Sequence, residues 1–304
     1  AMAQAAAPAN FTPFYIDVGN CGATVTRLGR VLVPGVGQFD VGGMRYNERD
    51  PEAAEPRNFG QAVVIMSPHV DAVYHSVYEG MLRTLLVLPQ LNKNPALRIV
   101  TTDKPHMLQF LRVLGIDTRR VVRGLLVYAS HKFYKYDVQA HVRLIVPNGI
   151  PHSNPPRQLL DMFRCYTASL RSTAPQAVPV IAVVERRPNS QRSYDQHNLL
   201  MKQLKRAMKG RAIVKVWRYD RNPTLAESIR FFSLVSVLVG PHGAGIGANM
   251  IHMPEGSSVI ELIGSPAYLH PCNINLANIL GLRHFTVLAN QPNKQGPMDF
   301  PNVT

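Results

Sequence analysis

The sequence predicts a mixed α/β protein with two tandem doubly wound domains, each built on a parallel sheet. Apolar runs suited to buried strands alternate with amphipathic helical patterns from residue 62 onward. Residues 150–156 hold three prolines among small polar residues, and such a segment marks a linker because it cannot continue a helix or a central strand. Residues 233–261 have the pattern of a strand, a glycine-rich turn, a short helix and a second strand.

The first half follows this alternation. Residues 1–59 are rich in Gly, Pro and Asn, which favours short strands and loops placed on the first domain. The helix expected at 75–88 carries apolar residues at Val77, Met81, Leu85 and Leu88. The expected elements are strands at 62–66, 98–101 and 124–129, and helices at 75–88 and 106–114.

The second half begins after the linker. Thr224 is expected to cap a helix, and Glu227 three residues later completes a capping box. The expected elements are helices at 158–171, 197–208 and 225–233, and strands at 178–184, 212–217, 233–239 and 258–262. We therefore expect domains at residues 1–150 and 156–290, with ligands at the carboxyl ends of the strands and a cleft between the domains.

The glycine-rich turn has the layout of a phosphate site. Gly243, Gly245 and Gly247 stand where a helix begins, so a diphosphate can approach backbone N–H groups at the positive end of the helix dipole. His242 could add a donor to the same anion. The spacing is neither the dinucleotide fingerprint nor a P-loop, because it lacks the third glycine of the first and the lysine of the second. A tight turn without a ligand is the alternative.

These residues resemble glycosyltransferase family 61. The resemblance lies in two segments, Val239-Gly-Pro-His-Gly-Ala-Gly-Ile246 and Pro254-Glu-Gly-Ser-Ser-Val-Ile-Glu261, and in two weaker ones, Tyr74-His-Ser-Val-Tyr-Glu79 and Val184-Glu-Arg-Arg-Pro-Asn-Ser-Gln-Arg192. It covers residues 60 to 290. Many relatives have an aromatic residue where this chain has Ser76, and the sequence after Arg192 also departs from the family, which leaves the local conformation there open.

The resemblance implies the GT-B architecture, in which two Rossmann-like domains face a cleft. It implies an inverting transferase that uses a UDP-sugar, with the donor on the C-terminal domain and the acceptor and catalytic base on the N-terminal domain. Relatives use xylose, arabinose or N-acetylglucosamine donors on glycans and proteins. The tail at 291–304 is expected to return to the first domain.

The donor site is expected to be cationic. Arg186, Arg187 and Arg192 are candidates for a diphosphate clamp, because a guanidinium binds phosphate oxygens in a fork and stays charged. A solvated basic loop is the alternative. Glu261 could accept hydrogen bonds from the ribose hydroxyls, or it could be a buried acid that holds a loop. The full set of candidate donor-binding residues is Arg186, Arg187, Arg192, His242, Gly243, Ala244, Gly245 and Glu261.

The catalytic candidates are Glu79 and His75. An inverting transfer needs a base for the acceptor hydroxyl, and these residues are four apart, so on a helix their side chains share a face. Either could be the base and the other its orienting partner. An ordinary surface pair is the alternative.

Composition agrees with a folded enzyme. Hydrophobic residues make up 46% and charged residues 17% of 304, which excludes a disordered chain, and no window reaches the ~18 apolar residues of a membrane span. Sequons at Asn10 and Asn302 suit the secretory pathway. With the family resemblance they lead us to expect the lumen of the Golgi or endoplasmic reticulum, and a single-pass type II protein with an N-terminal anchor.

The net charge of +14 indicates an anionic ligand or a basic solvated surface. Nucleic acid is a rival partner, because basic and aromatic residues alternate at 131–136, but no nucleic-acid module is recognisable and we expect none to bind. A catalytically inactive nucleotide-sugar-binding or glycan-binding protein is the other alternative.

Neither a cofactor nor a metal is expected. Three cysteines without a C-x-x-C pair give neither a disulfide framework nor a zinc site, and the chain lacks an Asp-x-Asp motif. The only tryptophan, Trp217, could face the uracil or pack in the core, and core packing is the favoured interpretation.

Overall fold

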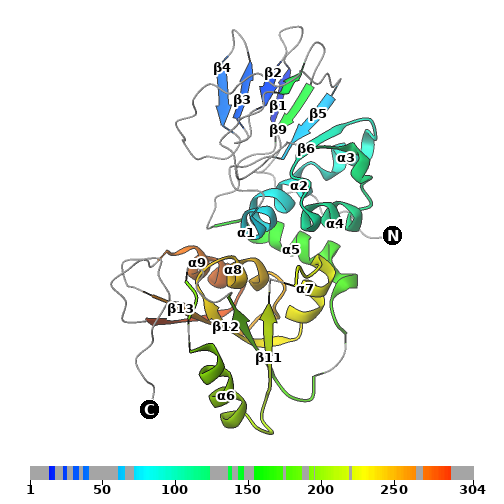
Figure 1. Ribbon diagram of the computed structural model, residues 1–304. Helices are drawn as coiled ribbons and strands as arrows, with labels where there is room; N and C mark the ends of the chain where they lie inside the picture. The colour runs from blue at the N-terminus through cyan, green and yellow to red at the C-terminus, as the bar shows by residue number, and fades with distance from the viewer. Residues whose placement is uncertain are drawn as a thin grey trace. The chain divides into compact units, whose positions relative to one another are not determined.

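The structure is a computed structural model, and it divides the chain into two compact units, Ala1–Tyr166 and Thr167–Thr304. The residues described are 61–65, 72–123, 154–173, 176–186, 192–194, 196–218, 221–264 and 270–288, together with six further strands in unit 1, namely β1 (Phe14–Asp17), β2 (Ala23–Val25), β3 (Arg30–Val33), β4 (Gly37–Asp40), β8 (Tyr136–Val138) and β9 (Arg143–Val146). The predicted fold class, mixed α/β with two Rossmann-like domains, is confirmed (Figure 1).

Unit 1 contains two sheets. The first has the order β1-β9-β5-β6-β7, where β5 is Gln61–Val64, β6 is Arg98–Thr101 and β7 is Val121–Arg123. Its strands β9, β5, β6 and β7 run parallel, and β1 is antiparallel to β9. The second sheet, in the order β4-β3-β2-β8, is antiparallel. The strand expected at 124–129, Arg187 and the tail at 291–304 lie outside the described residues.

A wide helical turn interrupts the helix expected at 75–88. The chain forms α1 (Val73–His75), then a π-helix, η3 (Ser76–Met81), then α2 (Leu82–Leu86), followed by α3 (Leu88–Lys93). The four apolar positions that predicted the helix are all buried. An apolar stripe cannot distinguish a π-turn from an α-turn, because one extra residue in a single turn barely shifts the buried face.

The boundary between the units differs from the expected one. Helix α5 (Arg157–Tyr166) belongs to unit 1, where it packs on α2, and Phe163 stacks on Phe110 of α4 (Pro105–Val113) with ring centroids 5.2 Å apart. The sequence analysis placed this helix in the second domain because prolines precede it. Prolines mark the end of an element, but they do not show which core the next apolar stripe joins.

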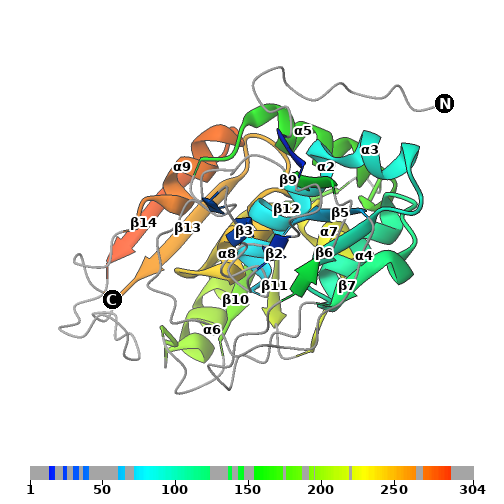
Figure 2. The ribbon, with the colours of Figure 1, turned by 90° about the horizontal axis from the view of Figure 1, so that it is seen from above.

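Unit 2 is a five-stranded parallel sheet in the order β11-β10-β12-β13-β14. Helix α6 covers one face, and α7, α8 and α9 cover the other (Figure 1). Figure 2 shows β13 and β14 side by side at one edge. The elements are β10 (Val180–Glu185), α6 (His197–Ala207), β11 (Ile213–Arg218), α7 (Leu225–Phe232), β12 (Val235–Pro241), α8 (Ala244–Met250), β13 (Ser258–Ile263), α9 (Cys272–Ile279) and β14 (Arg283–Leu288).

Local signals in unit 2 are confirmed. Thr224 Oγ1 accepts a hydrogen bond from the Glu227 N–H at 3.1 Å, and the Glu227 carboxylate accepts one from the Thr224 N–H at 2.7 Å, which completes the capping box. Trp217 is 9% exposed and stacks on Phe231 with centroids 4.7 Å apart, so it packs in the core as expected. The elements α9 and β14 were not predicted.

Candidate functional site

The central strands of unit 2 create a topological switch point. Strand β10 lies between β11 and β12, so the chain leaves β10 toward one edge of the sheet and later returns to its other side. In open α/β sheets the crevice outside the carboxyl ends of two such strands is where ligands bind. Arg186 follows β10, and His242 and Gly243 follow β12, so three predicted site residues stand at this point.

Gly243 adopts a conformation that essentially only glycine allows. Its φ of 130° and ψ of −166° fall in a region that a Cβ atom excludes. A Cβ at this position would also lie 2.9 Å from Nη1 of Arg192 and 3.4 Å from Nη2 of Arg186. The missing side chain therefore leaves room for two guanidinium groups against the turn. Two of the three arginines predicted to clamp a diphosphate lie together at the predicted glycine turn.

The backbone at Arg192 is also constrained. Arg192 has a φ of 61°, a left-handed conformation that is uncommon outside glycine. The next two residues, Ser193 and Tyr194, are only 2% and 5% exposed. The Tyr194 hydroxyl lies 2.7 Å from Nδ1 of His197, and its ring joins the buried cluster of Ile181, Val183 and Met201. This anchored tyrosine fixes the chain directly after the arginine, which settles the conformation that the sequence left open.

A charged pair closes the ends of β10 and β11. Glu185 and Arg218 are the last residues of these strands and are register partners, and Arg218 Nε donates a hydrogen bond to the Glu185 carboxylate. Nε2 of His197 lies 3.8 Å from the same carboxylate. Burial raises the pKa of Tyr194, and the nearby charge of Glu185 raises it further, so this phenol stays protonated. The sequence analysis missed this cluster. The feature that could have indicated it is that an acidic residue, Glu185, and a basic residue, Arg218, end two consecutive strands.

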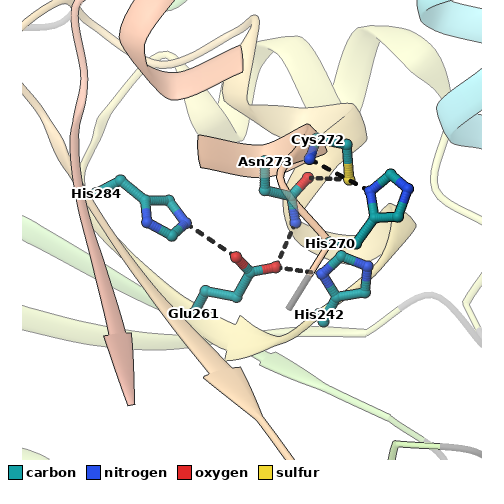
Figure 3. Close-up of polar contacts among 6 residues, drawn as sticks. All are labelled: His242, Glu261, His270, Cys272, Asn273 and His284. Carbon is teal, nitrogen blue, oxygen red and sulfur yellow. Dashed lines mark hydrogen bonds and ion pairs between the residues drawn. The ribbon is translucent and has the colours of Figure 1, made fainter. Parts of the chain in front are cut away.

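Glu261 is the centre of a buried polar network (Figure 3). It has 0% exposure, and its Oε1 lies 2.6 Å from Nδ1 of His242 and 2.5 Å from Nδ2 of Asn273. Its Oε2 lies 2.9 Å from Nε2 of His284. Burial on its own would raise the pKa of Glu261, but the hydrogen bonds from His242, His284 and Asn273 and the charge of His242 together lower it to about 2. Glu261 is therefore ionised at any ordinary pH.

This geometry bears on the two roles considered for Glu261. Glu261 has no exposed surface, and three protein donors already point at its two oxygens, so a ribose hydroxyl could reach it only after a rearrangement of these side chains. The contacts therefore favour the second role, that of a buried acid that holds its neighbours. Asn273 and His284 belong to α9 and β14, the elements that the sequence did not reveal, and this is why the network was missed.

In unit 1 the pair His75 and Glu79 is formed as the spacing predicts. Nδ1 of His75 lies 2.7 Å from Oε1 of Glu79, and the side chains are 17% and 5% exposed. Glu79 belongs to the π-helix η3, and π-helical turns are often found at functional sites. The Tyr74 ring contacts the His75 ring edge-on with centroids 5.5 Å apart, and it lies 4.9 Å from the ring of Tyr78.

Arg83 is a further residue of this site that the sequence analysis missed. It follows Glu79 by four residues, has 0% exposure, and is the largest fully buried side chain of the described residues. Burial lowers the pKa of Arg83 to about 10, while the charge of Glu79 opposes that shift. Arg83 therefore stays cationic, and Glu79 lies between a histidine and an arginine on one helical path. The sequence feature that could have indicated Arg83 is that it is a single arginine within the apolar face of a helix.

Two Rossmann-like units, with arginines at the switch point of the second, define a class of α/β proteins suited to anionic nucleotide ligands. The family model Glycosyltransferase 61 matches residues 73–260, more than half of the chain, and the chain belongs to this family. It is a glycosyltransferase. A search of curated proteins found no match. Among the described residues no helix has both the length and the apolar character needed to cross a bilayer.

Proposed function

We propose that this glycosyltransferase moves a sugar from a UDP-sugar to a glycan or glycoprotein acceptor, with inversion at the anomeric carbon. The observation that carries the proposal is the position of Arg186 and Arg192 against Gly243 at the switch point of unit 2. Two fixed cations beside a turn without a side chain suit a diphosphate, which needs close approach and compensation of its charge. Helix α8 has only seven residues, so the arginines carry most of this argument.

On the donor side, Arg186, Arg187, Arg192 and His242 hold the diphosphate, and Gly243, Ala244 and Gly245 let it approach the backbone. When the bond between the anomeric carbon and the phosphate oxygen breaks, the electron pair leaves with UDP. The guanidinium groups compensate the charge that develops on the leaving phosphate, a role that metal ions fill in other transferases. The proposed transfer therefore needs neither a cofactor nor a divalent ion.

On the acceptor side, Glu79 takes the proton of the attacking hydroxyl. His75 donates from Nδ1 to the carboxylate and fixes its orientation, and Arg83 keeps a positive charge beside it. The acceptor oxygen then attacks the face of the anomeric carbon opposite the diphosphate, which gives inversion. The transferred sugar is xylose, arabinose or N-acetylglucosamine, the donors used by relatives.

Nucleotide binding tests the proposal directly. The protein is titrated calorimetrically with UDP, GDP and CMP, each in EDTA and again with manganese, and a panel of UDP-sugars follows. We expect UDP to bind in EDTA, and the bound nucleotide to raise the melting temperature because it binds only the folded state. Absence of nucleotide binding by the folded protein would overturn the donor site. Binding of UDP only with manganese would overturn metal independence.

We also propose that the protein acts in the lumen of the Golgi or endoplasmic reticulum, behind an N-terminal anchor in its full-length form. The sequons at Asn10 and Asn302 support this location, since their glycosylation requires entry into the secretory pathway. Digestion of protein secreted from animal cells with an N-glycosidase checks it. A loss of apparent mass is the expected result, and unchanged mobility together with cytosolic localisation of the full-length protein would contradict the proposal.

A further inference from the structure

We propose that Glu261, Asn273 and His284 form a positioning unit that fixes the orientation of the His242 ring and keeps its Nδ1 protonated, and that this unit sets the affinity for the diphosphate of the donor. The inference rests on the proposed function and deepens it. It assigns Glu261 to a position behind the site, where it acts through His242 and does not touch the nucleotide.

The first step concerns the proton on His242. A carboxylate accepts and cannot donate, and Glu261 is ionised, so the ring nitrogen at 2.6 Å from its Oε1 must be Nδ1–H. Nε2 lies on the far side of the ring from Glu261 (Figure 3), and it can donate to an anion only when it also carries a proton. A carboxylate bonded to Nδ1–H holds the ring in one orientation and stabilises this doubly protonated imidazolium.

The second step concerns what holds Glu261. Its side chain receives donors from three elements besides its own strand β13, namely His242 after β12, Asn273 of α9 and His284 of β14. A second hydrogen bond fixes the His242 backbone, whose N–H donates to the Leu262 carbonyl at 3.0 Å. The imidazole is thus tied to β13 at both its ring and its main chain. Rotation of the ring would break a buried charge-assisted hydrogen bond.

The third step joins His242 to the anion site. His242 directly precedes Gly243, where the guanidinium groups of Arg186 and Arg192 lie. The positive side of the site is therefore assembled from two directions. The arginines come from the segment after β10, and the histidine is held from β13, α9 and β14. Without the positioning unit the arginines keep their places, and only the contribution of His242 is lost.

A double-mutant cycle with two ligands tests the proposal. Wild type, Glu261→Gln, His242→Ala and the double variant are titrated with UDP and with inorganic diphosphate. The glutamine has the shape of the acid but no charge, so it does not stabilise the second proton that His242 needs in order to donate to the anion. We expect Glu261→Gln to weaken both ligands about 10-fold to 100-fold, the effect that orienting carboxylates have on histidine ligands of metals. The double variant should bind no more weakly than His242→Ala alone.

The other possible results of these titrations each contradict one part of the proposal. If Glu261→Gln weakens UDP but not diphosphate, or adds its full loss to that of His242→Ala, then Glu261 contacts the ribose and the positioning role is wrong. If the variant binds both ligands like wild type, the unit has no effect on the site. If wild-type protein binds neither ligand, the donor site itself fails, which separates the two proposals.

Two further variants separate positioning from folding. Ser257→Ala removes the buried hydrogen bond from Ser257 Oγ to the Val235 carbonyl, at 3.1 Å, and should lower the melting temperature without changing affinity. His284→Leu removes one donor from the far oxygen of Glu261, and we expect it to weaken diphosphate and UDP alike by a smaller factor than Glu261→Gln. If Glu261→Gln does not fold, His284→Leu carries the test alone, and wild-type affinity in that variant overturns the proposal.

Discussion

The two units each contain a histidine bonded through Nδ1 to a buried glutamate, and the two pairs differ in everything around that bond. In unit 1, His75 and Glu79 lie 2.7 Å apart on one helical path, four residues from each other. In unit 2, His242 and Glu261 lie 2.6 Å apart but come from the ends of different elements, and two further donors occupy the carboxylate. The same kind of bond therefore stands in two different surroundings.

The difference shows how surroundings assign a role to a carboxylate. Glu261 is held ionised by three donors, with a pKa of about 2, and so it cannot exchange a proton near neutral pH. Glu79 pairs with His75, whose side chain is 17% exposed, and it lies on a π-turn. The carboxylate beside a partly exposed histidine is the candidate base, and the fully buried one with three donors is the candidate holder.

The largest expected effect is on chemistry at Glu79. Glu79→Gln keeps the shape of the side chain but removes the base, so we expect the rate of transfer to fall about 10²-fold to 10⁴-fold while UDP affinity is unchanged. His75→Ala should give a smaller loss, since the base remains and only its orientation is affected. Transfer kinetics with the UDP-sugar found in the binding panel measure both. Wild-type turnover by Glu79→Gln would break the comparison, since the two glutamates would then share a structural role.

Acid stability is expected to distinguish the second glutamate. The pKa of Glu261 is lowered by folding from 4.5 to about 2, so its stabilising contribution is fully present above pH 4.5 and is lost as the pH falls toward 2. That contribution is on the order of 3 kcal/mol. Urea unfolding between pH 6 and 3 should show a shallower decline in the free energy of unfolding for Glu261→Gln than for wild type. Equal slopes would mean that the carboxylate is not held ionised as described.

Loss of one arginine should weaken binding of the donor without affecting the catalytic base. Arg192→Ala removes charge-assisted hydrogen bonds worth ~1.5–3 kcal/mol, so we expect UDP affinity to fall about 10-fold to 100-fold. Arg206→Ala, on the exposed side of α6, removes the same charge from unit 2 and is the matched control. Calorimetry with UDP measures both. If both variants lost UDP affinity to the same extent, the effect of Arg192 would be explained by general electrostatic attraction and not by a specific contact.

The smallest effect sharpens the role of the glycine turn. Gly243→Ala strains the backbone and displaces Arg192, whereas Gly256→Ala, at a φ of 79° with open space around it, causes strain alone. Each strain costs ~1–3 kcal/mol of stability, measured by chemical unfolding. We expect only Gly243→Ala to weaken UDP binding as well. An alanine at residue 243 that leaves UDP affinity intact would show that the close approach of the arginines has no part in binding.

Local patterns in the sequence predicted the fold and those contacts of the sites that join residues close together in the chain. The alternation of apolar runs, the Thr224 capping box and the spacing of His75 and Glu79 are all short-range signals, and the structure contains them. The long-range contacts had no such signal. The partners Asn273 and His284 are 12 and 23 residues from Glu261 in the chain. They lie on α9, whose uncharged sequence gives little contrast between faces, and on β14, whose mostly exposed residues do not alternate as a buried strand would.

The compact units divide after Tyr166, beyond the proline-rich segment at which the sequence placed the boundary, because an apolar helix face does not show which core it joins. Arg83 escaped notice because a buried arginine is rare, so a single one in an apolar stripe is ordinarily taken for a surface residue. Only the resemblance to the family could predict that Arg186 and Arg192 lie against Gly243. Arg192 and Gly243 are 51 positions apart in the sequence, so no short-range pattern connects them.

The family match stops at residue 260, one residue before Glu261, yet the donors that hold this acid lie at Asn273 and His284. The minimal folding unit therefore extends beyond the matched segment, at least to the end of β14. A fragment ended shortly after β13 would retain the glycine turn and both arginines, but it would bury an ionised carboxylate with two of its three donors removed. Truncation boundaries for expression or crystallisation belong after residue 288.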